Sequence, residues 1–277
     1  MRPRMIQYLP RLLLVLAVLL GAAPGAGAWG PDGHRIVGEI AWRELSPPTK
    51  PALRTLLEED ATLAEASAWA DTNARRNRHW KYLEPLHYVD VDPGGSALRV
   101  PRSCKCVIGA IEIERDRLAD PAKSQADRVL ALRLVAHFVG DVHQPLHVSH
   151  LDGRGGTRVN VRFDARPTTL HRLWDSGLIA RELRERGRKR GPRWRSWAQS
   201  LADGVSPAER AQWIASRDPR VWAEESLELA RAYTFEVREG AVLGDAYFER
   251  SLPVVARRLQ QAGVRLAALL EDATRRR

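Results

Sequence analysis

Apolar residues recur along most of the chain at intervals of three and four positions, which is the period of an amphipathic helix. The clearest stretch covers residues 128–142, where His137 and Asp141 share one stripe with apolar positions because they lie four residues apart. Ser206 marks another helix start, since a proline follows it directly and a glutamate comes three residues later. We expect further helices over residues 34–45, from 207 onward, from 219 to about 235 and over 252–270.

Strict alternation of apolar and polar residues, which predicts strands, is confined to one place. Residues 159–163 alternate in this way behind a glycine-rich turn at 153–156, and they predict a small hairpin. We find neither an internal repeat nor a linker that would divide the chain. The pattern therefore predicts one all-α domain over residues 29–277, mainly helical, with a small β-hairpin.

The first 28 residues have the organisation of a secretory signal peptide. Three arginines accompany an apolar run over residues 12–20, and small residues follow, ending in Ala26, Gly27 and Ala28. The apolar run is about half the ~20 residues that a membrane-spanning helix requires, which argues against an uncleaved anchor. We expect residues 1–28 to be removed, which would leave Trp29 with a free α-amino group. The mature protein would then be secreted or periplasmic and not held in a membrane.

The composition fits an ordinary globular domain. The 277 residues are 44% apolar and 28% charged, with 20 glycines and 17 prolines, which excludes a disordered or collagen-like chain. The formal charge of +10 falls to +7 when the three arginines of residues 1–28 are subtracted, and this surplus favours anionic partners. Residues 181–195 hold eight lysines or arginines against two glutamates. We expect a solvated loop there, with a phosphate-attracting face as the alternative.

The side chains that could bind a metal are histidines with nearby aspartates. His137 and Asp141 are followed by the helix-breaking Pro145 and by His147, and the spacing of His137 and Asp141 recurs in His171 and Asp175. A single pair of this kind is usually a surface hydrogen bond between neighbouring helix turns. Two pairs with an additional histidine inside 40 residues favour a metal site instead, and imidazole with carboxylate suits zinc.

The order of motifs resembles that of the zinc-dependent single-strand-specific nucleases and 3′-nucleotidases, a family of secreted fungal, plant and bacterial enzymes. The resemblance covers residues 29 to about 270 and rests on WGPDGH from Trp29 to His34, WAD ending at Asp71, LHYVD around His87, HFVGDVHQPLH from His137 to His147, and LHRLWD ending at Asp175.

The resemblance implies an all-α fold, as in the phospholipase C and nuclease group, with three zinc ions in a cleft. The first zinc would be held by Asp71, His87, His137 and one oxygen of Asp141. The second would be held by the amine and carbonyl of Trp29, by His34 and by the other oxygen of Asp141. The third would be held by His147, His171 and Asp175, which leaves positions for water and substrate.

The resemblance also implies an activity. The enzyme would hydrolyse single-stranded DNA and RNA to 5′-phosphate products, and would remove the 3′-phosphate of nucleotides, with a metal-activated hydroxide as nucleophile and with Asp71 and Asp141 as catalytic residues. Tyr88 and Asp90 match the positions of the family's base pocket, although ordinary packing is the alternative for Tyr88. Thr157 stands where the family has a substrate-binding asparagine. We expect a monomer.

The cysteines are a further departure from the family pattern, and two rival functions were weighed against it. Cys104 and Cys106 form a tighter ring than the disulfide loop that the family usually closes at this place, and the resemblance leads us to expect that they are bonded. A soft metal site is the alternative, which the lack of any other cysteine disfavours. A zinc phospholipase C would have its first histidine further from the tryptophan and a glutamate as its last ligand. A non-enzymatic nucleic-acid-binding protein would not need nine ordered ligands. The other histidines, expected at surface or supporting positions, are His79, His143 and His150.

Overall fold

The computed structural model describes residues 29–57, 60–73, 77–91, 98, 104–149, 154–187 and 191–275, so the expected signal peptide lies outside the described residues. The helical elements are α1 (Pro31–Glu44), α2 (Lys50–Leu56), α3 (Leu63–Thr72), η2 (Arg78–Leu86), α4 (Val107–Ala119), α5 (Gln125–Val142), η3 (Pro145–His147), α6 (Leu170–Arg172), η5 (Leu173–Gly177), α7 (Leu178–Glu185), α8 (Arg193–Asp203), α9 (Pro207–Ile214), α10 (Pro219–Tyr233) and α11 (Asp245–Arg275). The strands are β1 (Asn160–Phe163), β2 (Arg166–Thr169) and β3 (Val242–Leu243).

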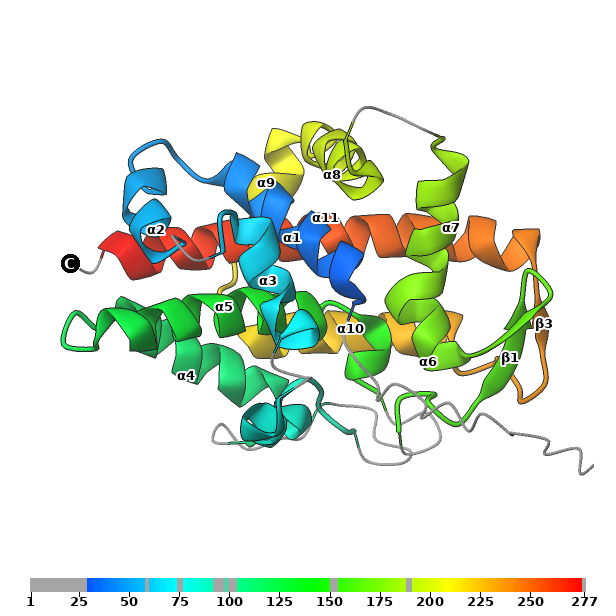
Figure 1. Cartoon of the computed structure of the whole chain (residues 1–277). Helices are drawn as coiled ribbons and strands as arrows, with labels where there is room; N and C mark the ends of the chain where they lie inside the picture. Colours follow the sequence, from blue (N-terminus) through cyan, green and yellow to red (C-terminus); the bar gives the residue numbers. More distant parts are fainter. Residues whose placement is uncertain are drawn as a thin grey trace, which may run out of the picture.

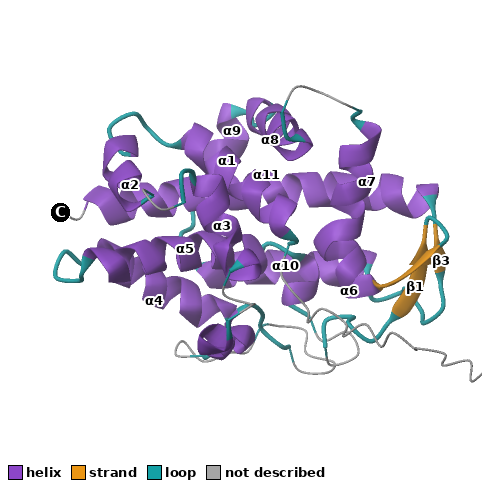
Figure 2. Ribbon diagram, viewed as in Figure 1, coloured by secondary structure: helices purple, strands orange, loops and turns teal. Residues whose placement is uncertain are grey.

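The long helix α11 runs through the length of the molecule, and α1, α4, α5, α7, α8 and α9 pack along it (Figure 1). In this view α8 and α9 lie on one side of α11 and α4, α5 and α10 on the other, while α1 crosses α11. Helix α1 packs against α3, α8 and α11, so its buried face of isoleucine, valine and alanine is covered on several sides. Helices dominate the fold and the strands form a small patch at one end, which confirms the predicted all-α class (Figure 2).

The predicted helix starts agree with the structure where a capping residue marks them. Ser206 caps α9 in a capping box, in which its hydroxyl accepts from the backbone N–H of Glu209 and that glutamate accepts from the backbone of Ser206. Asp218 caps α10 by accepting from the backbone N–H of Arg220. Helix α5 begins after Ser124, three residues before the predicted start, and ends at Val142 as expected.

The last helix is longer than the pattern predicted. The amphipathic pattern predicts a helix that begins near residue 252. The structure instead places Pro253 inside α11, which begins at Asp245. The residues before the proline supply the reason, since Phe248 and Ser251 are buried and continue the apolar face of Val254 and Val255. Packing on both sides of Pro253 therefore offsets the backbone hydrogen bond that a proline removes.

The expected hairpin is present and belongs to a slightly larger sheet. Strands β1 and β2 pair antiparallel, with Asn160 opposite Thr169 and Phe163 opposite Arg166. The two turn residues Asp164 and Ala165 have φ values of 49° and 61°, which is the left-handed conformation that a tight hairpin requires. The pattern gave no sign of β3, a strand of two residues that pairs parallel with β1.

Two further expectations can be compared with the structure. Cys104 and Cys106 form a disulfide directly before α4, which confirms the expected bond and excludes a soft metal site at these two residues. The basic segment is only partly a loop where the structure describes it, because residues 181–185 belong to α7 and 193–195 to α8, whereas 186–187 and 191–192 lie outside the helices. Arg181 makes ion pairs with Asp164, Glu185 and Asp245.

No helix within the described ranges has both the length and the apolar character needed to cross a membrane.

Candidate metal centre

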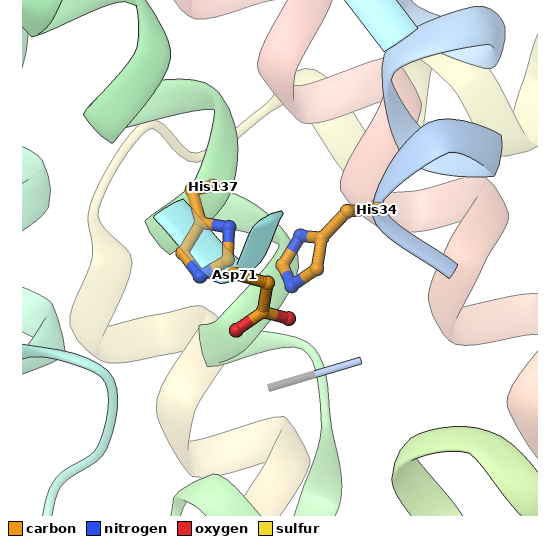
Figure 3. A group of neighbouring side chains, drawn as sticks. All are labelled: His34, Asp71 and His137. Carbon is orange, nitrogen blue, oxygen red and sulfur yellow. The ribbon is translucent and has the colours of Figure 1, made fainter. Parts of the chain in front are cut away.

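The sequence-predicted ligands come from separate elements that meet beside α5. His34 lies in the first turns of α1, Asp71 near the end of α3, and His87 directly after η2. His137 and Asp141 lie one turn apart on α5, and His147 ends the short η3 turn that follows α5. His171 and Asp175 lie in the continuous α6–η5 segment after the hairpin. Figure 3 shows His34, Asp71 and His137 converging from three different helices.

Five of these residues form one group, which we call the large group: His34, Asp71, His87, His137 and Asp141. Within it, the nearest ligand atoms of His34, Asp71 and His137 lie within 4.8 Å of one another, and so do those of His87, His137 and Asp141. The rings of His34 and His137 stack with centroids 3.9 Å apart. Such close approach of imidazoles and carboxylates is the geometry of a site built for cations.

Asp141 occupies the middle of the large group. Its Oδ1 atom lies 3.3 Å from Nε2 of His34. Its Oδ2 atom lies 3.0 Å from Nδ1 of His87 and 3.5 Å from Nε2 of His137. The two oxygens of one fully buried carboxylate therefore face different histidines. This arrangement suits a carboxylate that bridges two cations.

The remaining three ligands form a second group, which we call the small group. Nε2 of His171 lies 3.3 Å from Oδ2 of Asp175, and Nε2 of His147 lies 3.7 Å from Oδ1 of the same residue. All three residues are buried, and their nearest ligand atoms lie within 4.8 Å of one another. The spacing of His171 and Asp175 thus places both on one face, as the sequence pattern predicted.

Backbone carbonyls orient the rings of both groups. Nδ1 of His137 lies 2.9 Å from the carbonyl oxygen of Ser67. Nδ1 of His147 lies 2.7 Å from the carbonyl oxygen of His87. His171 makes the same contact with the Gly155 carbonyl at 2.7 Å. A proton on Nδ1 leaves Nε2 as the lone-pair donor towards the group, which is how proteins fix metal-binding imidazoles.

Gly155 is a glycine for steric reasons. Its φ is +56°, and an added Cβ would lie 2.4 Å from the Leu146 carbonyl oxygen and 3.3 Å from Nδ1 of His171. Gly140 on α5 is similarly constrained, since a Cβ there would lie 2.8 Å from Nδ1 of His34. The turn at 155 and the surface of α5 are therefore shaped around the histidine rings.

The electrostatics of the large group favour a bound cation. Burial raises the pKa of Asp141 to about 7, because the carboxylate is removed from water. Burial also lowers the pKa of His137, so its neutral form is favoured. Oδ1 of Asp141 and Nε2 of His147 are buried and make no hydrogen bond to any described residue. A cation would stabilise the ionised carboxylate and use the neutral imidazoles, so these residues fit a metal.

Trp29 and the expected substrate residues lie around the two groups. The Trp29 side chain is fully buried, and the next N–H, of Gly30, donates to the Asp175 carbonyl at 2.7 Å. Tyr88 and Asp90 are exposed on the same face of an extended segment, on either side of the buried Val89. Val89 N–H donates to the carbonyl of His147 at 2.8 Å, which holds this segment beside the small group.

Thr157 and the other histidines have different surroundings. The Thr157 hydroxyl donates to the Arg154 carbonyl at 3.0 Å in the turn that carries Gly155. His79 is exposed, as expected, and His150 lies outside the described residues. His143 is not a surface residue, because it is fully buried with Nε2 2.9 Å from Nη1 of Arg265. It points away from the stripe of His137 and Asp141 and contacts α11.

Gln144 is a buried residue of the site that the sequence did not single out. Its Nε2 donates to Oδ1 of Asp175 at 2.5 Å, and its Oε1 accepts from the backbone N–H of Leu146 at 2.6 Å. One side chain thus connects the turn that carries His147 to the carboxylate of Asp175. Its only signal in the sequence is its place between a helix end and a proline, which does not reveal where its amide points.

Comparison with known proteins agrees with this geometry. The family profile described as S1/P1 Nuclease matches residues 29–275. The chain is 32% identical to Endonuclease 2 of Arabidopsis thaliana, over 94% of this chain and 95% of that protein. It is 33% identical to Endonuclease 4 of the same plant, over 95% and 94%, and 28% identical to Nuclease S1 of Aspergillus oryzae, over 95% and 98%. The protein therefore belongs to the S1/P1 nuclease family and is a hydrolase that cleaves nucleic acids.

Proposed function

We propose that the protein is an exported zinc-dependent nuclease that cleaves single-stranded DNA and RNA to 5′-phosphate products and also acts as a 3′-nucleotidase. The observation that carries this proposal is the position of Asp141, whose two oxygens face His34 on one side and His87 with His137 on the other. The small group lies beside it with three buried ligands. Family membership supplies the nucleic-acid substrate.

We assign three zinc ions to the two groups. Asp71, His87, His137 and Asp141 hold the first, and His34, Asp141 and the backbone amine and carbonyl of Trp29 hold the second. His147, His171 and Asp175 hold the third. Histidine nitrogens and carboxylate oxygens are the donors that zinc takes at sites with open positions. When bound, zinc supplies Lewis acidity that makes water nucleophilic near neutral pH and offsets the charge of a phosphodiester.

The chain's own residues position the reaction. Water attacks phosphorus, the bond to the 3′-oxygen breaks, and the proton lost by water ends on the departing oxygen. Asp141 is fully buried and holds its neighbours in place, while Asp71 is only partly buried and can reach solvent. We therefore assign the attacking water to the side of the large group that Asp71 faces, where the carboxylates of Asp71 and Asp141 can both accept its hydrogen bonds. No side-chain nucleophile is required.

The substrate is held by the exposed residues beside His87. Tyr88 is 41% exposed, which leaves its ring open for stacking with a base. Asp90 lies on the same face and can accept hydrogen bonds from base amino groups. Stacking on an aromatic ring is tolerant of sequence, and it requires a base that has left its own stack, which favours single strands. Thr157 replaces the larger amide of the family pattern, so we assign it a weaker substrate contact.

Export is part of the same proposal. Residues 1–28 are assigned to a signal peptide whose removal frees the Trp29 amine, so the active enzyme forms only after cleavage and is secreted or periplasmic. The backbone of Trp29 can bind zinc as a chelate only when its nitrogen is an amine, because an amide nitrogen is a poor ligand at neutral pH. We assign the mature enzyme as a monomer.

The decisive experiment removes and restores the metal. The exported protein should cleave single-stranded DNA and RNA and release phosphate from a 3′-nucleotide, and its oligonucleotide products should carry 5′-phosphates. A chelator should abolish all three activities and zinc should restore them. Calcium serves as the control, because it prefers oxygen ligands in larger numbers than this site offers. Full activity in a preparation shown to hold no metal, or products with 3′-phosphates, would contradict the proposal.

A further inference from the structure

We infer that η2 carries a binding surface for single-stranded nucleic acid, separate from the metal ligands and from Tyr88. The surface consists of Arg78, Trp80, Lys81 and Tyr82, and we call it the η2 strip. The inference rests on the proposed function, because it names the part of the chain that would contact a polymeric substrate. In Figure 1, η2 is the teal coil between α3 and α4 in sequence colour, at the lower edge of the molecule.

Exposure of aromatic side chains is the first observation. Only Leu83 is buried among the nine residues of η2, and Tyr82 is 57% exposed. Within the described part of the chain, Tyr82 and Tyr88 are the only large aromatic side chains that are exposed. Both lie within five positions of His87, one before it and one after it. Two exposed rings that flank one candidate ligand offer the stacking platform on which single-stranded nucleic acid is bound.

Ring contacts fix the strip next to the large group. Trp80 packs edge-on against Trp69, with centroids 5.1 Å apart, and Trp69 lies two residues before Asp71 on α3. The ring of Tyr82 lies 6.1 Å from that of Trp80, at an interplanar angle of 42°. Trp80 therefore anchors η2 to α3, while Tyr82 stays in solvent.

The charge of the strip suits phosphates. Arg78 and Lys81 are exposed, and Glu84 is the only acid on η2. The facing element is α4, where Glu114 is nearly covered and hydrogen-bonded to Arg117 at 3.1 Å. Burial raises the pKa of Glu114, and its partner Arg117 offsets what charge it carries. Basic residues that alternate with aromatic rings are the composition of a surface that follows a nucleic-acid backbone and stacks its bases.

The position of the strip separates long substrates from short ones. Tyr82 precedes His87 by five residues, which is of the order of 10 Å along a 3₁₀ segment. A single nucleotide has one base, and when that base stacks on Tyr88 none is left to stack on Tyr82. A longer strand can occupy both places at once, so the strip contributes to the binding of polymers and not to the hydrolysis of a 3′-nucleotide.

The test compares variants of the zinc-loaded, exported protein. Tyr82→Ala should lower kcat/KM on a long single strand between about 5-fold and 100-fold, because one stacked base is lost. Tyr82→Phe keeps the ring and should stay within about twofold of wild type. The double variant Arg78→Ala/Lys81→Ala should reduce the slope of log K against log salt by about 1.4, at about 0.7 for each phosphate contact.

Controls separate this surface from a general effect. The double variant Arg238→Ala/Arg257→Ala removes the same charge from exposed positions outside η2 and should leave the salt slope unchanged. Release of phosphate from a 3′-nucleotide should be unchanged in every variant. The inference is overturned if Tyr82→Ala cleaves long strands like wild type, or if it slows both substrates equally.

A direct binding measurement keeps the inference distinct from the proposed function. Fluorescence anisotropy with a phosphorothioate oligothymidylate, which resists hydrolysis, reports the Kd of each variant without turnover. Weaker binding by Tyr82→Ala, with wild-type affinity in Tyr82→Phe, supports the η2 strip even if the wild-type protein cleaves no strand. Such a lack of cleavage would overturn the proposed function alone, whereas equal Kd values for all variants would overturn the η2 strip alone.

Discussion

Gln144 shows how a single neutral side chain can organise two charged ones. Its amide donates to Oδ1 of Asp175, while Oδ2 of the same carboxylate faces His171. Its carbonyl oxygen holds the backbone N–H of Leu146, at the start of the turn that ends in His147. Groups that hydrogen-bond to metal-binding side chains set their direction, and their loss typically weakens metal binding. Gln144 is thus a positioning residue for the small group.

We predict that Gln144→Ala weakens zinc binding at the small group by about 10-fold to 100-fold. Asp175 would lose the hydrogen bond from the Gln144 amide, and the His147 turn would lose the hydrogen bond that holds the Leu146 N–H. Zinc competition against a chromophoric chelator measures the affinity directly, without relying on activity. Gln260→Ala is the matched control, because Gln260 also donates a side-chain amide hydrogen bond, to the Leu201 carbonyl at 2.8 Å, but lies on α11 away from the ligands. Equal zinc affinities in the two variants would exclude the positioning role.

The sequence predicts which of the candidate ligands share a face of a helix, but not how their rings are oriented. His137 with Asp141, and His171 with Asp175, were placed correctly on shared faces because a four-residue spacing on a helix fixes their directions. The orientation of each ring could not be predicted, since it depends on the carbonyls of Ser67, His87 and Gly155, which are distant in sequence. The same limit explains His143, whose burial depends on Arg265 of α11.

At the scale of elements, a buried ionic network fastens the end of α5 to α10 and α11. Arg258 is 1% exposed and uses all five N–H donors, towards Glu225, Gln261, Ser226 and the carbonyls of Trp222 and His143. Burial lowers the pKa of Arg258 to about 10. Arg265 makes a bidentate pair with Glu225 at 2.6 and 2.7 Å. The network holds the residues that immediately follow Asp141.

We predict that Glu225→Ala destabilises the protein by about 3 kcal/mol, at the lower end for breaking a buried ion pair, because a third of the glutamate side chain is exposed. The buried guanidinium groups of Arg258 and Arg265 would then lose the carboxylate that pairs with both of them. Urea unfolding followed by circular dichroism measures the difference. Glu224→Ala is the control, since it makes the same substitution at the preceding, exposed position of α10 and should change stability by less than about 0.5 kcal/mol. Similar losses in both variants would show that the network contributes little.

Element boundaries were predictable where local chemistry decides them. Ser206 and Asp218 mark helix starts because their side chains accept from backbone N–H groups that have no partner inside the helix. The start of α11 and the strand β3 were not predictable, since each depends on contacts made across the fold. Pro253 is tolerated only because the apolar face on both sides of it is covered. The two residues of β3 form a strand only because β1 is beside them.

At the scale of the whole molecule, the fold brings Trp29 and the first turns of α1 to the candidate metal ligands. Trp29 is fully buried, and the following residue is hydrogen-bonded to Asp175 of the small group, while His34 on the next turns of α1 reaches Asp141 of the large group. The first residues of the domain therefore contact both groups. This placement links the proposed signal cleavage to the proposed metal site, because an amine at Trp29 is created only by that cleavage.

A change at the amino terminus of Trp29 tests this link. A protein produced without export and beginning with methionine directly before Trp29 would move the free amine by one residue and replace it with an amide. The chelate of the Trp29 nitrogen and carbonyl would be lost, so zinc content should fall from three towards two per chain, and activity should fall about tenfold for each 1.4 kcal/mol of lost transition-state stabilisation. The fold should survive, because the core does not depend on that amine. Trimming the extra methionine should restore both zinc and activity. If the exported, extended and trimmed forms hold equal zinc and are equally active, the Trp29 amine is not a ligand.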